Sequence, residues 1–218
     1  MIKAEHKKWA RVVYDIYITR LLKRNFNRFL MTNEFPLVDK QSALIITPNH
    51  FSWWDGFFIS FFTDKKITRK IHLLMLEEQL KQYWFFKKVG AYSINTNSPK
   101  SIIETINYTA GILNDKNNFV VYYPQGKIEN YDKRPPGIKE GIIKVVDRIK
   151  IPTEILPVIL KIVYSTNKQP DIHVRAGNKI TINPGEKFYN RFKENFSETL
   201  IELDNYALTG DERDLFIQ

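Results

Sequence analysis

A histidine and an aspartate five residues apart, His50 and Asp55, are the pair in this sequence best suited to acid–base chemistry. An aspartate bonded to one imidazole nitrogen fixes the tautomer and leaves the other nitrogen free to accept a proton. Five residues of regular helix turn through about 500°, so the two side chains would not share a helix face. They can meet only if His50 lies in a turn and Asp55 sits in the first turn of the helix that follows.

The sequence supplies no thiol nucleophile for this pair. It contains no cysteine, which excludes disulfides, thiolate nucleophiles and zinc sites built on cysteine. The other histidines, His6, His72 and His173, are scattered along the chain, so we expect no metal site. A base without its own nucleophile fits a substrate that brings its own hydroxyl group. The alternative is that His50 only caps a helix.

The segments around the pair predict a strand, a turn and a helix. Residues 43–47 are a short apolar run that ends at Pro48, which is typical of a buried strand. An aromatic-rich segment at 53–62 predicts a helix that begins near Ser52. This order of elements provides the geometry that the histidine and the aspartate need.

Strands and helices alternate along the rest of the chain. Apolar runs predict strands at 71–75, 92–95, 118–123 and 155–164, and helical spacing covers 77–88, 98–114, 138–149 and 188–207. Two further strand segments, 171–176 and 179–183, flank Gly177-Asn178, which predicts a β-hairpin. We therefore expect an α/β fold with a mixed, largely parallel central sheet flanked by helices, with an N-terminal amphipathic helix.

That N-terminal helix is expected over residues 4–31, where apolar and basic side chains recur at three- and four-residue steps. Its expected apolar positions are Trp9, Val12, Val13, Ile16, Leu22, Phe26, Phe29 and Leu30. Two interpretations stay open: the helix packs on the domain with its basic side in water, or it lies on anionic lipid. We assign residues 1–35 to this basic segment and residues 36–218 to the main domain.

Charge and hydropathy restrict the partners of the protein. The chain of 218 residues has a formal net charge of +9, although residues 194–218 are acidic. A basic body attracts polyanions such as an anionic membrane, an acidic carrier or a nucleic acid. No helix-turn-helix, RNP or zinc-finger pattern occurs, so a nucleic-acid-binding module is the weaker alternative. No apolar run is long enough to span a bilayer, and we expect a peripheral protein on the cytoplasmic face of the membrane.

Several sequence blocks, taken in order, resemble a known family. The segment 49–55 is similar to the H-x4-D block of the PlsC-type superfamily of glycerolipid and lysophospholipid acyltransferases. A glycine-led block at 90–95, an aromatic-Pro-Gln-Gly block at 122–126 and an apolar block with a central proline at 155–158 follow in the family's order. The segment 137–141 is similar to the family's Lys-x-Gly segment. The resemblance spans most of the chain.

The resemblance implies direct acyl transfer without an acyl-enzyme. His50, held by Asp55, would take a proton from a hydroxyl of a lipid acceptor such as a lyso-lipid. The alkoxide would attack the thioester of acyl-CoA or acyl carrier protein, with backbone N–H groups near Gly126 stabilising the oxyanion. No bound cofactor is implied. The matching blocks place substrate-binding residues at Asn49, Asn95, Thr96, Gln125, Gly126 and Lys127.

Two blocks depart from the family's pattern. The second block ends in Asn95-Thr96, where the family has an acidic residue and an arginine. The third block has Gln125 in place of glutamate, followed after Gly126 by Lys127-Ile128 in place of Thr-Arg. An arginine can hold a phosphate through two parallel hydrogen bonds. The threonine and isoleucine that stand in its place here cannot.

These departures leave the acceptor open. A neutral or zwitterionic lipid hydroxyl is an alternative to lysophosphatidic acid. Four cations could replace the missing clamp: Lys100, Lys127, Lys133 and Arg134. A protein with the acyltransferase fold that binds lipid without catalysis is the alternative function, although His50 and Asp55 are both present.

Overall fold

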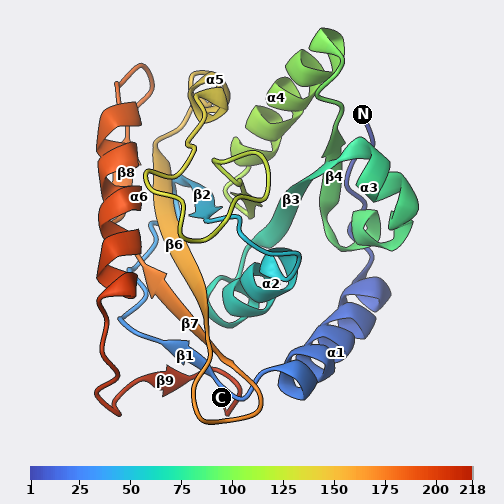
Figure 1. The fold of residues 1–218 in the computed structure, drawn as a ribbon. Helices are drawn as coiled ribbons and strands as arrows, with labels where there is room; N and C mark the ends of the chain where they lie inside the picture. The colour runs from blue at the N-terminus through green and yellow to red at the C-terminus, as the bar shows by residue number, and fades with distance from the viewer. Residues whose placement is uncertain (218) are drawn as a thin grey trace.

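The computed structural model describes residues 1–217, whose strands form one nine-stranded sheet (Figure 1). The strand order is β4-β3-β5-β2-β6-β7-β1-β9, and β8 pairs with β6. Strands β4, β3, β5, β2 and β6 run parallel, β7 and β8 are antiparallel to β6, β1 is parallel to β7, and β9 is antiparallel to β1. The mixed, largely parallel sheet is therefore confirmed. The strands are β1 (Phe29–Met31), β2 (Ala43–Pro48), β3 (Lys70–Leu76), β4 (Ala91–Ile94), β5 (Asn118–Val121), β6 (Thr153–Val163), β7 (Asp171–Ala176), β8 (Ile180–Ile182) and β9 (Arg213–Asp214).

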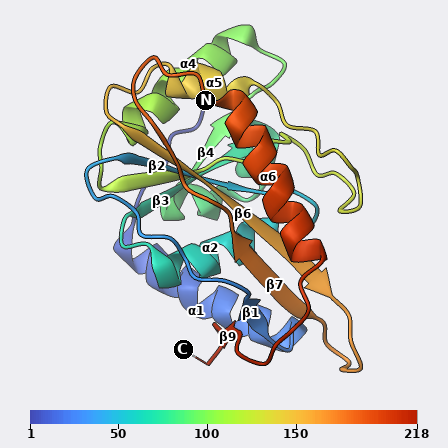
Figure 2. The ribbon, with the colours of Figure 1, turned by 90° about the vertical axis from the view of Figure 1, so that its left-hand side faces the viewer.

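Alternate residues of the central strands face two helical layers. Leu44 and Ile46 of β2 pack with α1 and α2, whereas Ala43 and Ile45 pack with α4, α5 and α6. A strand that is apolar on both faces needs this cover on both sides. Figure 2 shows α4 and α5 above the sheet and α1 and α2 below it. The helices are α1 (Lys8–Asn25), α2 (Asp55–Lys66), α3 (Glu77–Gln82), the 3-10 helix η1 (Trp84–Val89), α4 (Pro99–Leu113), α5 (Gly141–Val146) and α6 (Tyr189–Asp204).

The pairing of β2 with β5 decides where polar side chains meet. These strands are parallel neighbours, with Ile46 opposite Val121. Their carboxyl ends lie at the same edge of the sheet, which is where open α/β sheets bind their ligands. The turn after β2 carries His50, and the turn after β5 carries Gln125. Residues far apart in the sequence therefore meet at this edge.

The N-terminal helix is confirmed, but it is shorter than predicted. It ends at Asn25, and Phe29–Met31 form β1, which pairs with β7. The chain becomes extended at Phe26, with φ −128° and ψ 144°. The spacing of a short apolar run is compatible with a helix or a strand. Here the run forms a strand because it pairs with the edge of β7.

The packed face of α1 also differs from the prediction. Its buried residues are Ala10, Tyr14, Ile18 and Leu22, at four-residue steps. Of the predicted apolar positions within the helix, Leu22 is buried, whereas Trp9, Val12, Val13 and Ile16 are exposed. The helix thus carries apolar side chains on its outer side as well. No helix within residues 1–217 is both long enough and apolar enough to cross a membrane.

The predicted hairpin at Gly177-Asn178 is wrong. Strands β7 and β8 do not pair with each other, because both pair with β6. Strand β8 pairs with Thr153–Ile155 of β6, and β7 pairs with Val158–Val163 of β6. The eleven residues of β6 are thus long enough to pair with β8 and then with β7 along one side. The residue types in the turn between β7 and β8 do not reveal this pairing. Two predicted helices are also shorter: 138–149 reduces to α5, and 77–88 divides into α3 and η1.

Candidate active site

The turn after β2 brings His50 and Asp55 into direct contact. The Nδ1 atom of His50 donates to Oδ2 of Asp55 at 2.8 Å, and Asp55 is the first residue of α2. The imidazole is partly exposed, whereas the carboxylate is fully buried. The other ring nitrogen, Nε2, has no hydrogen-bond partner within residues 1–217. The arrangement leaves one free proton acceptor at the surface of the turn.

The Asp55 carboxylate also fixes the backbone of the turn. Its Oδ2 accepts from the N–H of Phe51 at 2.7 Å and from that of Ser52 at 2.9 Å, in addition to His50. Its Oδ1 is buried and has no partner in the described chain. Burial raises the pKa of the Asp55 carboxyl, while the bond from His50 and those from the backbone oppose this shift. In its ionised form the carboxylate orients the imidazole.

Tyr123, which the sequence analysis did not select, lies against the imidazole. The rings of Tyr123 and His50 are stacked, with centroids 4.3 Å apart and an angle of 29° between their planes. Tyr123 follows β5, so the pairing of β5 with β2 brings the two rings together. The Tyr123 hydroxyl is buried without a partner in residues 1–217. Burial, with the charge of Asp55, holds the pKa of this phenol well above its ordinary value, so the ring stays neutral.

Gln125 supports the backbone of the turn that carries His50. Its Oε1 accepts from the N–H of His50 at 2.5 Å, and its Nε2 donates to the carbonyl of His50 at 3.3 Å. The backbone N–H of Glu129 donates to the same carbonyl at 2.9 Å. Gln125 is buried, and both ends of its amide are bonded to the protein. These contacts do not favour the substrate-binding role expected of Gln125.

Asn49 has a comparable supporting position. Its Nδ2 donates to the carbonyl of Leu160 at 2.9 Å, and its Oδ1 accepts from the N–H of Leu160 at 2.8 Å. The side chain is only 3% exposed. The two bonds tie the start of the turn to β6 just beyond Pro48, where β2 ends. Asn49 thus holds the turn in place and offers little surface to a substrate.

The loop after Gln125 carries the free backbone donors near the pair. Gly126 has a φ of 68°, which favours glycine, and its N–H donates to the carbonyl of Tyr123. The N–H of Gly126 itself is therefore already bonded, whereas the expectation was for N–H groups near Gly126. The next two N–H groups, those of Lys127 and Ile128, have no acceptor in the part of the chain that the structure describes. The next residue, Glu129, donates its backbone N–H to the carbonyl of His50, so the N–H groups of Lys127 and Ile128 lie near His50.

Two cations near Gly126 remain without an ion-pair partner among the described residues. Lys127 is exposed, and Lys139 lies over Gly126, where its Nζ would be 3.1 Å from an added Cβ. The other candidates from the sequence are elsewhere or already paired. Lys133 pairs with Glu129, Arg134 pairs with Asp204, and Lys100 lies in the first turn of α4. Lys139 is the cation that the sequence analysis did not propose for this place.

The second block lies at the same edge of the sheet but not beside His50. Asn95 and Thr96 follow β4, and strands β3 and β5 separate β4 from β2. Three strand spacings amount to roughly 14 Å. The N–H of Asn95 is bonded to the hydroxyl of Ser101, and Thr96 is exposed. A ligand that contacts both blocks must therefore extend along this edge.

Other histidines do not join the site. His6 and His72 contact each other, with their Nε2 atoms 3.3 Å apart, although we expected them to be scattered. Within residues 1–217, no three histidine, aspartate or glutamate side chains gather in a way that could hold a metal ion. The polar groups of the candidate site are therefore His50, Asp55 and the loop after Gln125.

Comparison with known proteins gives two matches. The family model described as Acyltransferase matches residues 27–161, more than half of the chain. The crystal structure of the 1-acyl-sn-glycerophosphate (LPA) acyltransferase PlsC from Thermotoga maritima is similar, with a TM-score of 0.64 and 12% identity, over 90% of this chain and 80% of that chain. At that identity the likeness concerns the fold. No curated protein sequence matches this chain.

Proposed function

The chain belongs to the Acyltransferase family, and on this basis we propose that it moves a fatty acyl group from acyl-CoA or acyl carrier protein to a hydroxyl of a lipid. The main support is the 2.8 Å bond between His50 and Asp55, which leaves Nε2 unpaired within residues 1–217 on a partly exposed imidazole. A base with this geometry can activate a hydroxyl that the acceptor brings.

In the proposed reaction, Nε2 of His50 takes the proton of the acceptor hydroxyl while the oxygen attacks the thioester carbonyl carbon. The tetrahedral oxyanion accepts hydrogen bonds from the free N–H groups of Lys127 and Ile128. The carbon–sulfur bond then breaks, and the imidazolium returns its proton to the leaving thiolate. The Asp55 carboxylate and the face of Tyr123 stabilise the imidazolium while it exists. General-base catalysis of this kind contributes about 10²–10⁴-fold to the rate.

The cations at this edge favour an acceptor with at most one compact anionic group. Lys127 and Lys139 lie next to Gly126 as separate ammonium groups, and Arg134 of the same loop is already paired with Asp204. An ammonium binds phosphate as a point charge, without bidentate geometry. We therefore propose a lyso-lipid acceptor. A zwitterionic or neutral headgroup fits as well as lysophosphatidic acid.

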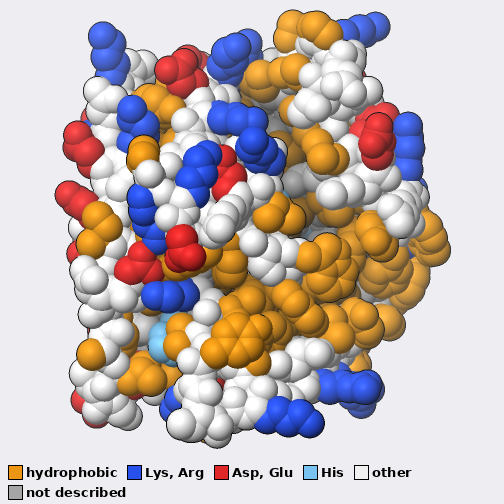
Figure 3. All heavy atoms as spheres, viewed as in Figure 1, with side chains coloured by type: hydrophobic (Ala, Val, Ile, Leu, Met, Phe, Trp, Pro, Cys, Tyr) orange, Lys and Arg blue, Asp and Glu red, His pale blue; other side chains and the backbone are white. Residues whose placement is uncertain are grey.

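We also propose that the protein takes its acceptor from an anionic membrane at the cytoplasmic face. Figure 3 shows hydrophobic side chains gathered in a broad area over α1, α2 and α3. The exposed members of this apolar surface are Trp9, Val12, Val13, Ile16 and Tyr17 of α1, with Trp53, Tyr83 and Trp84. Tryptophan and tyrosine rings are favoured at the boundary between lipid and water.

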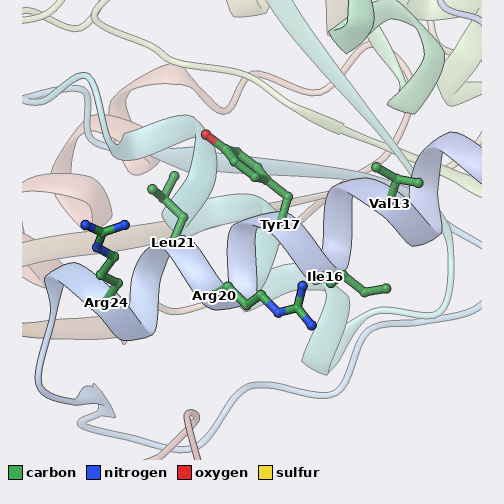
Figure 4. A pocket seen from close by; sticks show the side chains of 6 residues that line it. All are labelled: Val13, Ile16, Tyr17, Arg20, Leu21 and Arg24. Atoms are coloured by element: carbon green, nitrogen blue, oxygen red, sulfur yellow. The ribbon is translucent and has the colours of Figure 1, made fainter.

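Basic side chains border this apolar surface. Along the outer side of α1, Arg20 and Arg24 flank a shallow depression lined by Val13, Ile16 and Tyr17 (Figure 4). The ammonium of Lys88 lies 5.1 Å from the ring centre of Trp9 and 4.7 Å from that of Trp84. Each basic residue near an anionic bilayer contributes about 1 kcal/mol to binding. Apolar and basic groups thus support the same orientation on a membrane.

The apolar surface reaches the catalytic turn. Trp53 lies in that turn, two residues before Asp55, and is 59% exposed. Its neighbour Trp54 packs against Phe26 at the end of α1, with ring centres 5.2 Å apart. A lipid that leaves the membrane beside α1 would therefore arrive close to His50.

The decisive experiment incubates the protein with a panel of lyso-lipids and other hydroxyl lipids, together with acyl-CoA or acyl carrier protein. Mass spectrometry identifies the acylated product, and thiol release follows the donor. We expect His50→Ala to abolish transfer while folding and vesicle binding remain. Comparable transfer by this variant would refute the assignment of the base. Lipid binding by the wild-type protein without any thiol release would favour the non-catalytic alternative.

A further inference from the structure

We infer that Glu129 is a positioning residue that orients the Gln125 amide and, through it, the backbone of His50. Its carboxylate also favours an amide over a second carboxylate at position 125. The inference rests on the proposed function for its activity measurement. Its stability measurement is independent of that function.

Glu129 is buried in a network that closes the loop onto the catalytic turn. Its Oε2 accepts from Nε2 of Gln125 at 3.3 Å and from the N–H of Gly137 at 2.9 Å. Its Oε1 accepts from the ammonium of Lys133. Its own backbone N–H donates to the carbonyl of His50 at 2.9 Å. One residue therefore links the two ends of the loop to the turn that carries the base.

The donors and acceptors in this network permit only one orientation of the Gln125 amide. The N–H of His50 can only donate, so it requires Oε1 of Gln125 at 2.5 Å. The carboxylate of Glu129 can only accept, so it requires Nε2 of Gln125 at 3.3 Å. An amide satisfies both neighbours at once. The other nearby acceptor, the carbonyl of His50, also faces Nε2.

A glutamate at position 125 would satisfy His50 but not Glu129. One of its oxygens could accept from the N–H of His50, as Oε1 of Gln125 does now. The other would face the Glu129 carboxylate across the present 3.3 Å, in a place where both side chains are buried. Like charges at such a distance repel strongly when water is excluded. Lys133 lies on the far oxygen of Glu129 and cannot bridge the pair.

The test is a double-mutant cycle of the full-length wild-type protein, Gln125→Glu, Glu129→Gln and the double variant. Thermal unfolding at about pH 5 and pH 8 measures stability, because protonation of one carboxyl relieves a carboxylate pair at the lower pH. Thiol release from acyl-CoA measures kcat and KM.

Glu154→Gln is the matched control. Glu154 is also buried, pairs with Lys179 and accepts a backbone N–H, that of Asp39, but it lies at the start of β6, away from His50. It therefore repeats the chemical environment of Glu129 without the contact to the catalytic turn.

We expect Gln125→Glu to lower the melting temperature at pH 8 more than at pH 5, and to lower kcat with little change in KM for the donor. In the Glu129→Gln background the same substitution should cost on the order of tenfold less in kcat. Glu154→Gln should lower stability but leave kcat unchanged.

Equal effects of Gln125→Glu in the two backgrounds, in both stability and kcat, would overturn the inference. A loss of kcat in Glu154→Gln as large as in Glu129→Gln would overturn the positioning role. If the wild-type protein shows no thiol release, the proposed function fails. The coupling in melting temperature then still decides whether residues 125 and 129 form a pair.

Discussion

The aromatic ring of Tyr123 stacks on the imidazole of His50, with the ring centres 4.3 Å apart. The His50 imidazole is thus confined on one edge by the Asp55 carboxylate and on one face by a neutral phenol. An imidazolium on an aromatic face gains electrostatic stabilisation that the neutral imidazole does not. In the proposed reaction, the contact therefore stabilises the imidazolium while it exists.

Replacing Tyr123 separates the role of its ring from that of its hydroxyl. We expect Tyr123→Leu to lower kcat by about threefold to thirtyfold, because the cation–π contribution is lost. Tyr123→Phe should keep kcat and should not lower the free energy of unfolding, because the hydroxyl is buried without a partner in the described chain. Steady-state kinetics and urea unfolding of both variants test this. A kcat of Tyr123→Leu equal to that of Tyr123→Phe would contradict it.

Asp55→Asn should abolish most turnover and change the free energy of unfolding by less than about 1 kcal/mol at neutral pH. An amide oxygen can replace Oδ2 of Asp55 as an acceptor for His50 and the backbone. It cannot offer the negative charge that stabilises the imidazolium. Unfolding of this variant at neutral pH would instead favour a purely structural role in the turn.

The pH dependence of stability gives a second measurement on Asp55. Burial raises its pKa in the folded protein above the ordinary 3.8, so its ionisation costs stability as the pH rises from about 4 through the folded value. Asp55→Asn lacks this loss. We therefore expect the stability of the variant relative to the wild type to increase with pH across this window. Urea unfolding at several pH values measures the difference, and a constant difference would refute it.

The outer side of α1 can be tested by removing one apolar contact. Ile16→Asn should weaken binding to anionic vesicles about tenfold, because a buried aliphatic side chain contributes about 1.5–3 kcal/mol. Ile201→Asn on α6 is the control, since Ile201 is similarly exposed but lies in the opposite helical layer. Vesicle sedimentation at low and high salt measures both variants. Equal losses for the two would count against membrane docking through α1.

Thr96→Arg returns a guanidinium to the second block. We expect it to raise the preference for phosphate-bearing over neutral acceptors about tenfold, since a hydrogen bond to a charged group contributes about 1.5–3 kcal/mol. Ile103→Arg on α4 adds the same charge at an exposed position and should leave the preference unchanged. Product analysis with mixed acceptors measures the ratio. An unchanged acceptor profile in Thr96→Arg would mean that the headgroup does not reach this block.

Sequence reasoning succeeded where the interacting residues are close along the chain. The contact between His50 and Asp55 follows from a strand, a turn and a helix in succession, which are readable from an apolar run and a proline. It failed for α1, where apolar residues occur on two sides of one helix. Spacing identifies a helix, but the side that is buried depends on what packs against it. Here the apolar side chains of α2 and η1 cover Tyr14 and leave Ile16 exposed.

The sequence by itself determined the α/β class and the contact between His50 and Asp55, because both depend on relationships within a few residues. Only the tertiary structure decided which groups surround that pair. Tyr123, Gln125 and Glu129 lie more than seventy residues from His50 in the chain, and the parallel pairing of β2 with β5 brings them to it. Strand order depends on how all the elements share one core, so no local pattern contains it.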